Sequence, residues 1–297
     1  NKSKKRQLKS YKKTFFRHKN NDTYLSVSAQ LHAELFASAL SRVYTFGPTF
    51  RADPSDTAFH LAEFWMLEPE IAFANLETIM NLSEHLIHSC IDHLLHNDQT
   101  YQDLKALDNF HGDQCALIDQ LESVYALDAN FPRISYTDAV SMINTQAPPE
   151  ISDGETLVWG NDLRREHERF LCEQAFDGKP VFITDYPSTL KPFYMKRNQG
   201  EQKNRETVSC MDLVLPRIGE VIGGSAREDD YNRLVERMDE MEVSKSELSW
   251  YLDLRKYGSF PHAGFGIGFD RLVQFMTGMA NIRDVVPIPR YQKSCKF

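Results

Sequence analysis

Residues 42–73 read RVYTFGPTFRADPSDTAFHLAEFWMLEPEIAF, two segments rich in aromatic and β-branched residues that are joined by a polar stretch. Both segments, Arg42 to Phe50 and Glu63 to Phe73, have the composition of β-strands. The connection contains Pro, Ser and Asp and is too long for a tight turn, and loops of this length are often functional. The stretch therefore predicts a hairpin with charged groups at the mouth of its loop, a shape that suits nucleotide binding.

The second strand of this hairpin carries an unusual set of side chains on one face. Residues two apart in a strand share a face, and here that face carries Phe64, Met66, Glu68 and Glu70. Because unpaired carboxylates are very costly in a protein interior, the face is expected to line a polar cavity or to meet cations. Arg51, at the end of the first strand, is the nearest obvious cation. An ordinary amphipathic hairpin with charges at its edge is the alternative interpretation.

A second informative segment, residues 261–271, reads PHAGFGIGFDR. Glycines at 264, 266 and 268 alternate with apolar residues, and an acid–arginine pair then opens a helical pattern. Alternating glycines leave one face of a strand without side chains, so that another group can approach the backbone closely. Their spacing matches neither a dinucleotide-binding fingerprint nor a P-loop, and close packing of a helix on the sheet would explain them equally.

Taken together, the two segments resemble motifs 2 and 3 of the class II aminoacyl-tRNA synthetases, and much of the chain is similar to the asparaginyl members of that family. The similarity follows the family's order from about residue 15 to the C-terminus. It is carried by YLSVSAQLHAE (24–34), TFGPTFRADPSDTAFHLAEFWMLEPEIAF (45–73), WGNDLRREHERFL (159–171), DYPSTLKPFYM (185–195), MDLVLPRIGEVIGGSARE (211–228) and PHAGFGIGFDRLVQFMTGMANIRDVVPIPR (261–290). The resemblance implies an α+β fold, the class II synthetase catalytic fold, with a mainly antiparallel sheet flanked by helices and a helical insertion.

The implied activity is the ATP-dependent ligation of asparagine to tRNA(Asn), with ATP and Mg²⁺ as cofactors. The amino acid carboxylate attacks the α-phosphate of ATP, and the 3′ adenosine of the tRNA then captures the adenylate. This chemistry needs no protein nucleophile, because positioning and charge neutralisation accelerate phosphoryl-type transfer. Arginines, ligands for Mg²⁺ and a ring that stacks on the base are the groups that it requires.

The resemblance also implies roles for individual residues in the ATP site. Arg51 would hold the α-phosphate and the substrate carboxylate, since a planar guanidinium binds either group through two hydrogen bonds. Phe64 would stack on adenine, and Arg271 would pair with the γ-phosphate. His60 and Leu61 match the loop that covers the triphosphate. The catalytic set is Arg51, Glu220 and Arg271, and the ATP site also includes Asp53, Gly268, Phe269 and Asp270.

Asp212 and Glu220 match the acidic pair that holds Mg²⁺, a hard cation that takes oxygen ligands. A charge at a strand edge is the alternative interpretation of Asp212. Gln30 and Glu68 match the groups that receive the amino end of the substrate, although Gln30 could equally be a surface amide at a helix N-terminus. Arg227 matches the arginine that reaches the side-chain carbonyl of the substrate in both asparaginyl and aspartyl enzymes.

The choice between asparagine and aspartate depends on charge. In aspartyl relatives the segment matching residues 30–33 ends in a lysine that meets the substrate side-chain carboxylate, whereas this chain has Ala33, followed by Glu34. The loss of that cation favours asparagine, because discrimination between isosteres depends on which buried polar groups are paired. An aspartyl or non-discriminating synthetase is the alternative enzyme.

Several positions depart from the family pattern. Asp53 stands where the family usually has glutamate, and Ala29 replaces a glycine. The motif 2 loop usually reads Ser-Arg-His, whereas this chain reads Ala-Phe-His at residues 58–60 and so lacks one cationic contact to phosphate or tRNA. Asp53, Phe59 and the expected absence of motif 1 favour the other alternative, a truncated non-catalytic paralogue that acts as a binding module.

We expect residues 20–297 to form the catalytic domain, with about 97–155 as a helical insertion. Residues 1–19 hold nine Lys or Arg and no acid, and we expect them to be a basic tail or fragment edge. By the resemblance, we expect the anticodon-binding barrel and motif 1 to have no counterpart within residues 1–297. The expected partners are tRNA(Asn), asparagine and, in the full-length parent, a second copy; no apolar run is long enough to span a membrane. Similarity of residues 186–195 and 288–297 to animal mitochondrial members suggests the mitochondrial matrix, with the cytoplasm as alternative.

Overall fold

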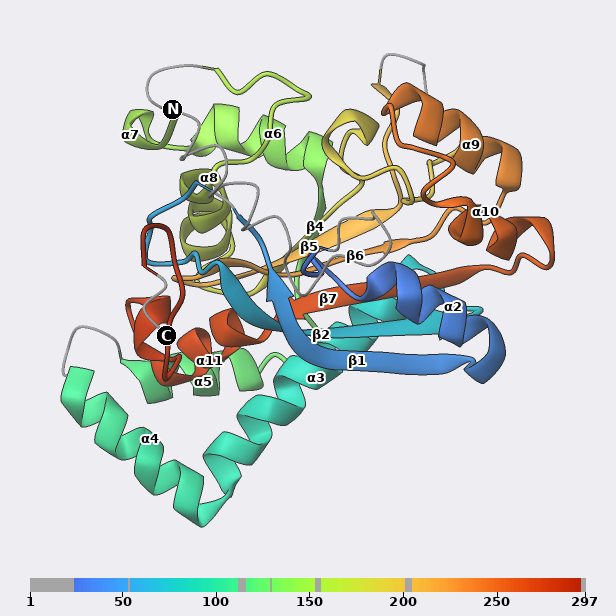
Figure 1. The fold of residues 1–297 in the computed structure, drawn as a ribbon. Coiled ribbons are helices and arrows are strands. Elements are labelled where there is room, and N and C mark those ends of the chain that lie inside the picture. The colour runs from blue at the N-terminus through green and yellow to red at the C-terminus, as the bar shows by residue number, and fades with distance from the viewer. Residues whose placement is uncertain are drawn as a thin grey trace, which may run out of the picture.

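A seven-stranded sheet forms the centre of the protein (Figure 1). The computed structural model describes residues 24–52, 54–111, 116–128, 130–152, 156–200 and 205–294. The strands are β1 (Arg42–Phe50), β2 (Glu63–Ala72), β3 (Arg133–Ser135), β4 (Val181–Thr184), β5 (Cys210–Leu215), β6 (Gly219–Ala226) and β7 (His262–Gly268). Their order is β1-β2-β7-β6-β5-β4-β3, and every neighbouring pair is antiparallel except β3 and β4. The structure thus confirms the expected α+β fold with a mainly antiparallel sheet.

Helices flank this sheet on both faces, with α3 and α11 on one side and α8 on the other (Figure 1). The helices are α2 (Gln30–Leu40), α3 (Leu76–His96), α4 (Asp98–His111), α5 (Leu117–Tyr125), α6 (Tyr136–Gln146), α7 (Pro149–Ser152), α8 (Arg165–Arg169), α9 (Tyr231–Glu240), α10 (Ser249–Lys256) and α11 (Phe269–Thr277). A π-helical turn, η2 (Phe170–Ala175), continues α8, and the short 3₁₀ turns η3 (Ser188–Leu190) and η5 (Ile282–Asp284) complete the set.

The alternation of side chains along β5 divides the core between the two faces of the sheet. Met211, Leu213 and Leu215 pack with α3 and α5 in one apolar cluster, whereas Cys210 and Val214 pack with α6 in another. Asp212 lies on the same face as Cys210 and Val214, but it is directed toward a cavity rather than into the apolar cluster. One strand therefore supports both cores and also carries a functional candidate.

The hairpin formed by β1 and β2 agrees with the sequence prediction within one residue. Its register pairs Arg42 with Ile71 and Phe50 with Glu63, without a bulge. Beyond the hairpin, the backbone of Phe50 is tied to Ser26, and that of Ala62 to Arg290, by hydrogen bonds of 2.9 and 2.7 Å. The segment before α2 and the C-terminal segment therefore hold the base of the motif 2 loop.

The glycines of β7 make room for side chains of β2. A Cβ atom at Gly264 would lie 2.0 Å from Oε2 of Glu70, and one at Gly266 would lie 2.5 Å from Cε of Met66. The close approach expected from the alternating glycines is confirmed, but at these two positions the approaching groups come from the neighbouring strand. Gly266 and Gly268 also face the cavity.

The expected helical insertion at about 97–155 differs from the observed structure. Residues in this range form α4 to α7, but they also contain β3, which pairs in parallel with β4 at the edge of the main sheet. A strand of three residues is too short to show alternation, so no pattern in this range indicated it. No helix in the described part of the chain could cross a membrane, and residues 1–19 lie outside the described residues.

We predict that Gly264→Ala will destabilise the fold by about 3 kcal/mol or more, because its methyl group would overlap the Glu70 carboxylate and disturb a buried ion pair. Urea unfolding followed by circular dichroism would measure this. Gly47→Ala, at a site in β1 with no atom within 4 Å of the added Cβ, is the matched control. Equal stability of the two variants would contradict the packing described above.

Candidate active site

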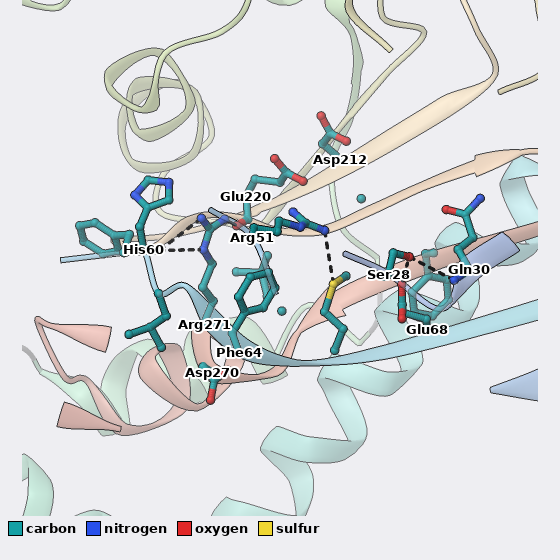
Figure 2. A pocket seen from close by; sticks show the side chains of 18 of the residues that line it. Ser28, Gln30, Arg51, His60, Phe64, Glu68, Asp212, Glu220, Asp270 and Arg271 are labelled. Carbon is teal, nitrogen blue, oxygen red and sulfur yellow. Dashed lines mark hydrogen bonds between the residues drawn. The ribbon is translucent and has the colours of Figure 1, made fainter. Parts of the chain in front are cut away.

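A cavity of about 410 Å³ lies over β2, β7 and β6 on the sheet face that carries Asp212 (Figure 2). It brings together most of the side chains singled out from the sequence, which come from segments far apart in the chain. Its lining includes Gln30, Arg51, His60, Leu61, Phe64, Glu68, Asp212, Glu220, Gly268, Asp270 and Arg271. In Figure 2, Gln30 and Glu68 lie at one end, His60 and Arg271 at the other, and Arg51 and Phe64 between them.

Arg51 and Phe64 form a cation–π pair in the middle of the cavity. The guanidinium of Arg51 lies 5.1 Å from the centroid of the Phe64 ring. Its Nε donates to the carbonyl of Val27 over 3.4 Å, and its Nη2 contacts Sδ of Met66 at 3.5 Å. These contacts orient the guanidinium but leave it without a buried carboxylate partner among the described residues, so its charge can serve an anion.

Arg271 anchors the other end, where α11 begins. Its Nη1 donates to the carbonyl of Glu220 over 2.8 Å, and its Nε and Nη2 contact the carbonyl of Phe59 at 3.4 and 3.3 Å. The loop around Phe59 is shaped by His60, whose Nδ1 lies 3.0 Å from the Ser55 hydroxyl and 2.6 Å from the Thr57 hydroxyl. The side chain of Arg271 therefore links β6 and the motif 2 loop through main-chain oxygens.

Asp212 and Glu220 face each other above a bare backbone. A Cβ at Gly223 would lie 3.0 Å from Oε1 of Glu220 and 3.4 Å from Oδ1 of Asp212. The register shift between Leu213 and Val214 breaks the regular alternation, which brings Glu220 to the face of Asp212. The charge of Asp212, followed by burial, raises the pKa of Glu220 above its ordinary value. Two oxygen donors that repel each other in this way suit a hard divalent cation.

The acidic pair has two neighbours that the sequence did not single out. Nζ of Lys191 donates to Oδ2 of Asp212 over 2.5 Å. Burial lowers the pKa of Lys191, but the negative charge of Asp212 outweighs this effect, and the pKa is raised. Glu168, on α8, accepts a hydrogen bond of 3.1 Å from the backbone of Glu220. Burial and the charge of Glu220 raise the pKa of Glu168 to about 8. Both residues lie in blocks that carry the resemblance, but only the fold shows that they meet.

Glu68 and Gln30 form the opposite end of the cavity. Glu68 accepts a hydrogen bond of 2.9 Å from the backbone of Ala29 and further ones from the hydroxyls of Ser28 and Thr45. Nε2 of Gln30 donates to Oε1 of Glu34 over 3.1 Å. Gln30 is the first residue of α2, is half-buried and lines the cavity.

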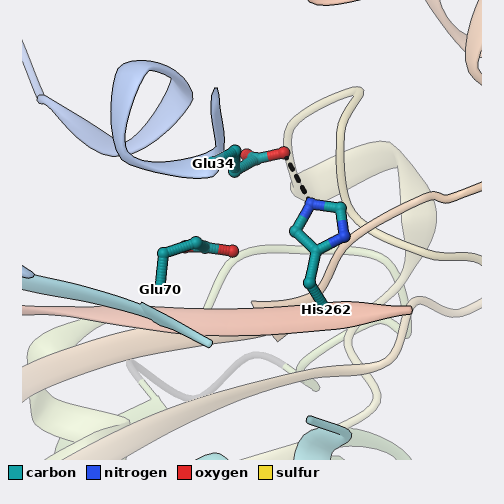
Figure 3. A group of neighbouring side chains, drawn as sticks. All are labelled: Glu34, Glu70 and His262. Carbon is teal, nitrogen blue, oxygen red and sulfur yellow. Dashed lines mark hydrogen bonds and ion pairs between the residues drawn. The ribbon is translucent and has the colours of Figure 1, made fainter. Parts of the chain in front are cut away.

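A buried network behind this end is centred on Glu34, the neighbour of Ala33. Glu34 accepts hydrogen bonds from the hydroxyl of Tyr251 at 2.7 Å and from Nη2 of Arg255 at 2.8 Å, and its Oε2 lies 3.0 Å from Nε2 of His262 (Figure 3). Burial raises the pKa of Glu34, but the His262 hydrogen bond and the charges of Arg255 and Arg227 lower it to about 2. The carboxylate is therefore ionised at neutral pH.

Arg227 lies behind the cavity wall rather than in it. Its Nε and Nη2 both donate to the carboxylate of Glu70 over 2.9 Å, Nη1 donates to Ser225, and Nε lies 4.0 Å from Oε1 of Glu34. The acidic face of β2 thus does both things that the sequence suggested, since Glu68 lines the cavity and Glu70 meets a cation, although that cation is Arg227 and not Arg51. The spacing of three side chains here would allow a metal ion to bind between Glu34, Glu70 and His262. The two carboxylates, however, already pair with Arg255 and Arg227.

Two other predicted residues have different positions. Phe269 points away from the cavity and packs edge-on against Phe46 at a centroid distance of 5.1 Å, so its assignment to the ATP site is not supported by the geometry. Asp270 reaches the cavity wall, and its Oδ2 accepts a hydrogen bond of 2.8 Å from the backbone of Trp65. This contact ties α11 to β2. Asp53 lies outside the described residues.

Comparisons with known proteins agree with this geometry. Residues 4–292 match the family model described as tRNA synthetases class II (D, K and N). The asparagine–tRNA ligase of Desulfotalea psychrophila is 48% identical over 90% of this chain and 56% of its own length, and that of Alkaliphilus oremlandii is 46% identical over 97% and 58%. The chain thus spans little more than half of these relatives.

Solved structures extend the comparison to the fold. The asparaginyl-tRNA synthetase from Pyrococcus horikoshii, complexed with asparaginyl-adenylate, superposes with a TM-score of 0.80 at 36% identity, covering 94% of this chain and 59% of that one. The aspartyl-tRNA synthetase from Entamoeba histolytica has a TM-score of 0.78 at 25% identity, covering 98% and 57%.

We predict that the network around Glu34 stabilises the fold in a pH-dependent way. A pKa of about 2 in place of 4.5 corresponds to roughly 3 kcal/mol of stability, which is complete above about pH 5 and is lost as the pH falls toward 2. Glu34→Gln should therefore cost most at pH 7 and progressively less between pH 4.5 and 2. Urea unfolding of both proteins across this range would test it; a difference that does not change with pH would contradict it.

Proposed function

The chain belongs to the class II tRNA synthetases (D, K and N), and we propose that the protein ligates asparagine to tRNA(Asn) through an asparaginyl-adenylate, at the expense of ATP. The observation that carries the proposal is one cavity in which the Arg51–Phe64 pair lies between Gln30 and Glu68 at one end, which would take the amino acid, and Arg271 at the other, which would take the phosphates. Relatives named asparagine–tRNA ligase support the same conclusion. The convergence of Arg51, Phe64, Glu220 and Arg271 on one cavity weakens the alternative of a non-catalytic binding module.

Each group then has a task that its position allows. Arg51 binds the α-phosphate and the carboxylate of asparagine, and thereby brings the two reacting groups together. Phe64 stacks on the adenine, and Arg271 binds the γ-phosphate from the end where His60 covers it. Glu68 receives the ammonium of the amino acid.

Asp212 and Glu220 would hold Mg²⁺, which would neutralise phosphate charge when bound. Their oxygens converge over Gly223, and their mutual repulsion fits a cation between them. Lys191 contacts Asp212 from the side, so it can offset part of the same negative charge. The reaction thus depends on fixed charges rather than on a protein nucleophile.

Selection of asparagine follows from the sign of charge beside Gln30. Ala33 supplies no cation, and the nearest ionised group that Gln30 contacts is the Glu34 carboxylate. A carboxylate accepts hydrogen bonds from the amide nitrogen of asparagine but repels the carboxylate of aspartate. Asparagine would therefore gain a favourable contact where aspartate would meet an unfavourable one. Arg227, close to Glu34, could reach the shared carbonyl only after a small shift away from Glu70.

We predict that asparagine, but not aspartate, will stimulate ATP–pyrophosphate exchange by the chain. Arg51→Ala should reduce the rate by about 100-fold or more, because it removes the cation between the two substrates. Arg42→Ala, at the far end of the same strand, is the control and should retain the rate. Stimulation by aspartate alone would instead identify an aspartyl enzyme, and equal stimulation a non-discriminating one.

The proposal extends to a homodimer. Tyr44, Phe46 and Trp65 are 72, 47 and 43% exposed on the hairpin face opposite the cavity, and β1 is the edge strand of the described sheet. Exposed aromatic patches of this kind mark interaction sites, and a second copy offers a self-complementary partner. A location in the mitochondrial matrix is proposed from the similarity of two short sequence blocks alone.

We predict that light scattering after gel filtration will give a mass near twice 34.3 kDa for the chain. Replacement of both Tyr44 and Phe46 by Asp should give a monomer, because buried unpaired carboxylates are costly. Phe110→Asp, on an exposed residue of α4, should leave the mass unchanged. A wild-type monomer at all concentrations would exclude this interface.

A further inference from the structure

Phe59 is held between two guanidinium groups at the phosphate end of the cavity. The guanidinium carbon of Arg165 lies 3.1 Å from the centroid of the Phe59 ring. Arg271 contacts the carbonyl oxygen of the same residue through Nε and Nη2. Phe59 and Arg271 line the cavity, and Arg165 lies directly against the Phe59 ring at this end.

Arg165 is fixed in this position by the turn between β5 and β6. It is the first residue of α8, and its Nη2 and Nε donate to the carbonyls of Arg217 and Ile218 over 2.6 and 3.3 Å. Gly219 follows with a φ of +90°, and an added Cβ there would lie 3.6 Å from Cγ of Arg165 and 2.8 Å from the Glu168 carboxylate. The glycine thus lets the turn lie close against α8.

The carboxylates of Glu168 and Glu166 raise the pKa of Arg165, but by less than burial and the neighbouring arginines lower it. Among the residues that the structure describes, neither Arg165 nor Arg271 forms an ion pair with a carboxylate. Burial and the charges of Arg169 and Arg271 lower the pKa of Arg165 to about 10, which leaves it cationic at neutral pH. Partly buried like charges are costly unless an anion offsets them.

We propose that Arg165 helps to bind the β- and γ-phosphates of ATP and supplies from α8 the positive charge that the motif 2 loop lacks at Phe59. The inference rests on the proposed function, because it assumes that the triphosphate occupies this end of the cavity. The Phe59 ring stands where the related loops have arginine, and its face holds the Arg165 guanidinium through a cation–π contact. Arg165 thus supplies, from another part of the chain, the positive charge that arginine supplies at position 59 of the related loops.

The test compares ATP with AMP, which lacks the β- and γ-phosphates. Isothermal titration calorimetry of Arg165→Ala in the presence of Mg²⁺ should show about tenfold weaker binding of ATP and of pyrophosphate, with AMP binding unchanged. Arg165→Lys, which keeps the charge without the planar fork, should lie between the two. Arg169→Ala removes an exposed cation on the same helix that is paired with Glu173, and it should bind ATP as the wild type does.

A second arm distinguishes phosphate binding from a packing role. Adding Phe59→Arg to the Arg165→Ala variant returns the cation to the loop, and ATP binding should recover while AMP binding stays constant. An equal loss of ATP and AMP binding, or a loss that Phe59→Arg does not restore, would overturn the inference in favour of a structural role. Unchanged ATP binding in Arg165→Ala would also overturn it. A wild-type chain that binds no ATP would instead refute the proposed function.

Discussion

The bidentate ion pair between Glu70 and Arg227 is the interaction on which the amino-acid end of the cavity depends. It joins β2 to the residue that follows β6 across the intervening strand β7, and it is possible only because Gly264 has no side chain in its path. Both partners are buried, so loss of either would leave an uncompensated charge at high cost. Glu34 lies 4.0 Å from the same arginine, and this links the pair to α2, α10 and the cavity.

This arrangement separates two kinds of electrostatic environment within one site. At the amino-acid end, carboxylates are paired with buried arginines, and their geometry is fixed before any substrate enters. At the opposite end, Asp212 and Glu220 repel each other although Lys191 contacts Asp212, and neither Arg165 nor Arg271 forms an ion pair with a carboxylate of the described residues. The first end therefore suits recognition of a small polar molecule, whereas the second gains stability only when charged ligands arrive.

The hairpin could be predicted because its signals are local, whereas most cavity residues were predicted from the family resemblance. Aromatic strands, a long polar loop and alternating glycines are visible within 32 contiguous residues and one short segment. The partners of buried charges are not local. Glu34 meets Tyr251 and His262 more than 200 positions away, and Lys191 meets Asp212 only after a loop and a strand have been placed. The ring of Phe269 packs against Phe46, although its neighbours Gly268 and Asp270 line the cavity, and its position in sequence alone does not show this.

The motif 2 loop shows why a departure in sequence is a weak argument for lost function. Position 59 was interpreted as a missing cation, which is correct for the loop taken alone. In the fold, however, the ring that replaces the arginine lies against a guanidinium from α8, more than 100 residues away. What phosphate binding requires is positive charge at a place in space, and any element that reaches this place can supply it. A substitution in a charged loop should therefore be judged together with the side chains that pack on it.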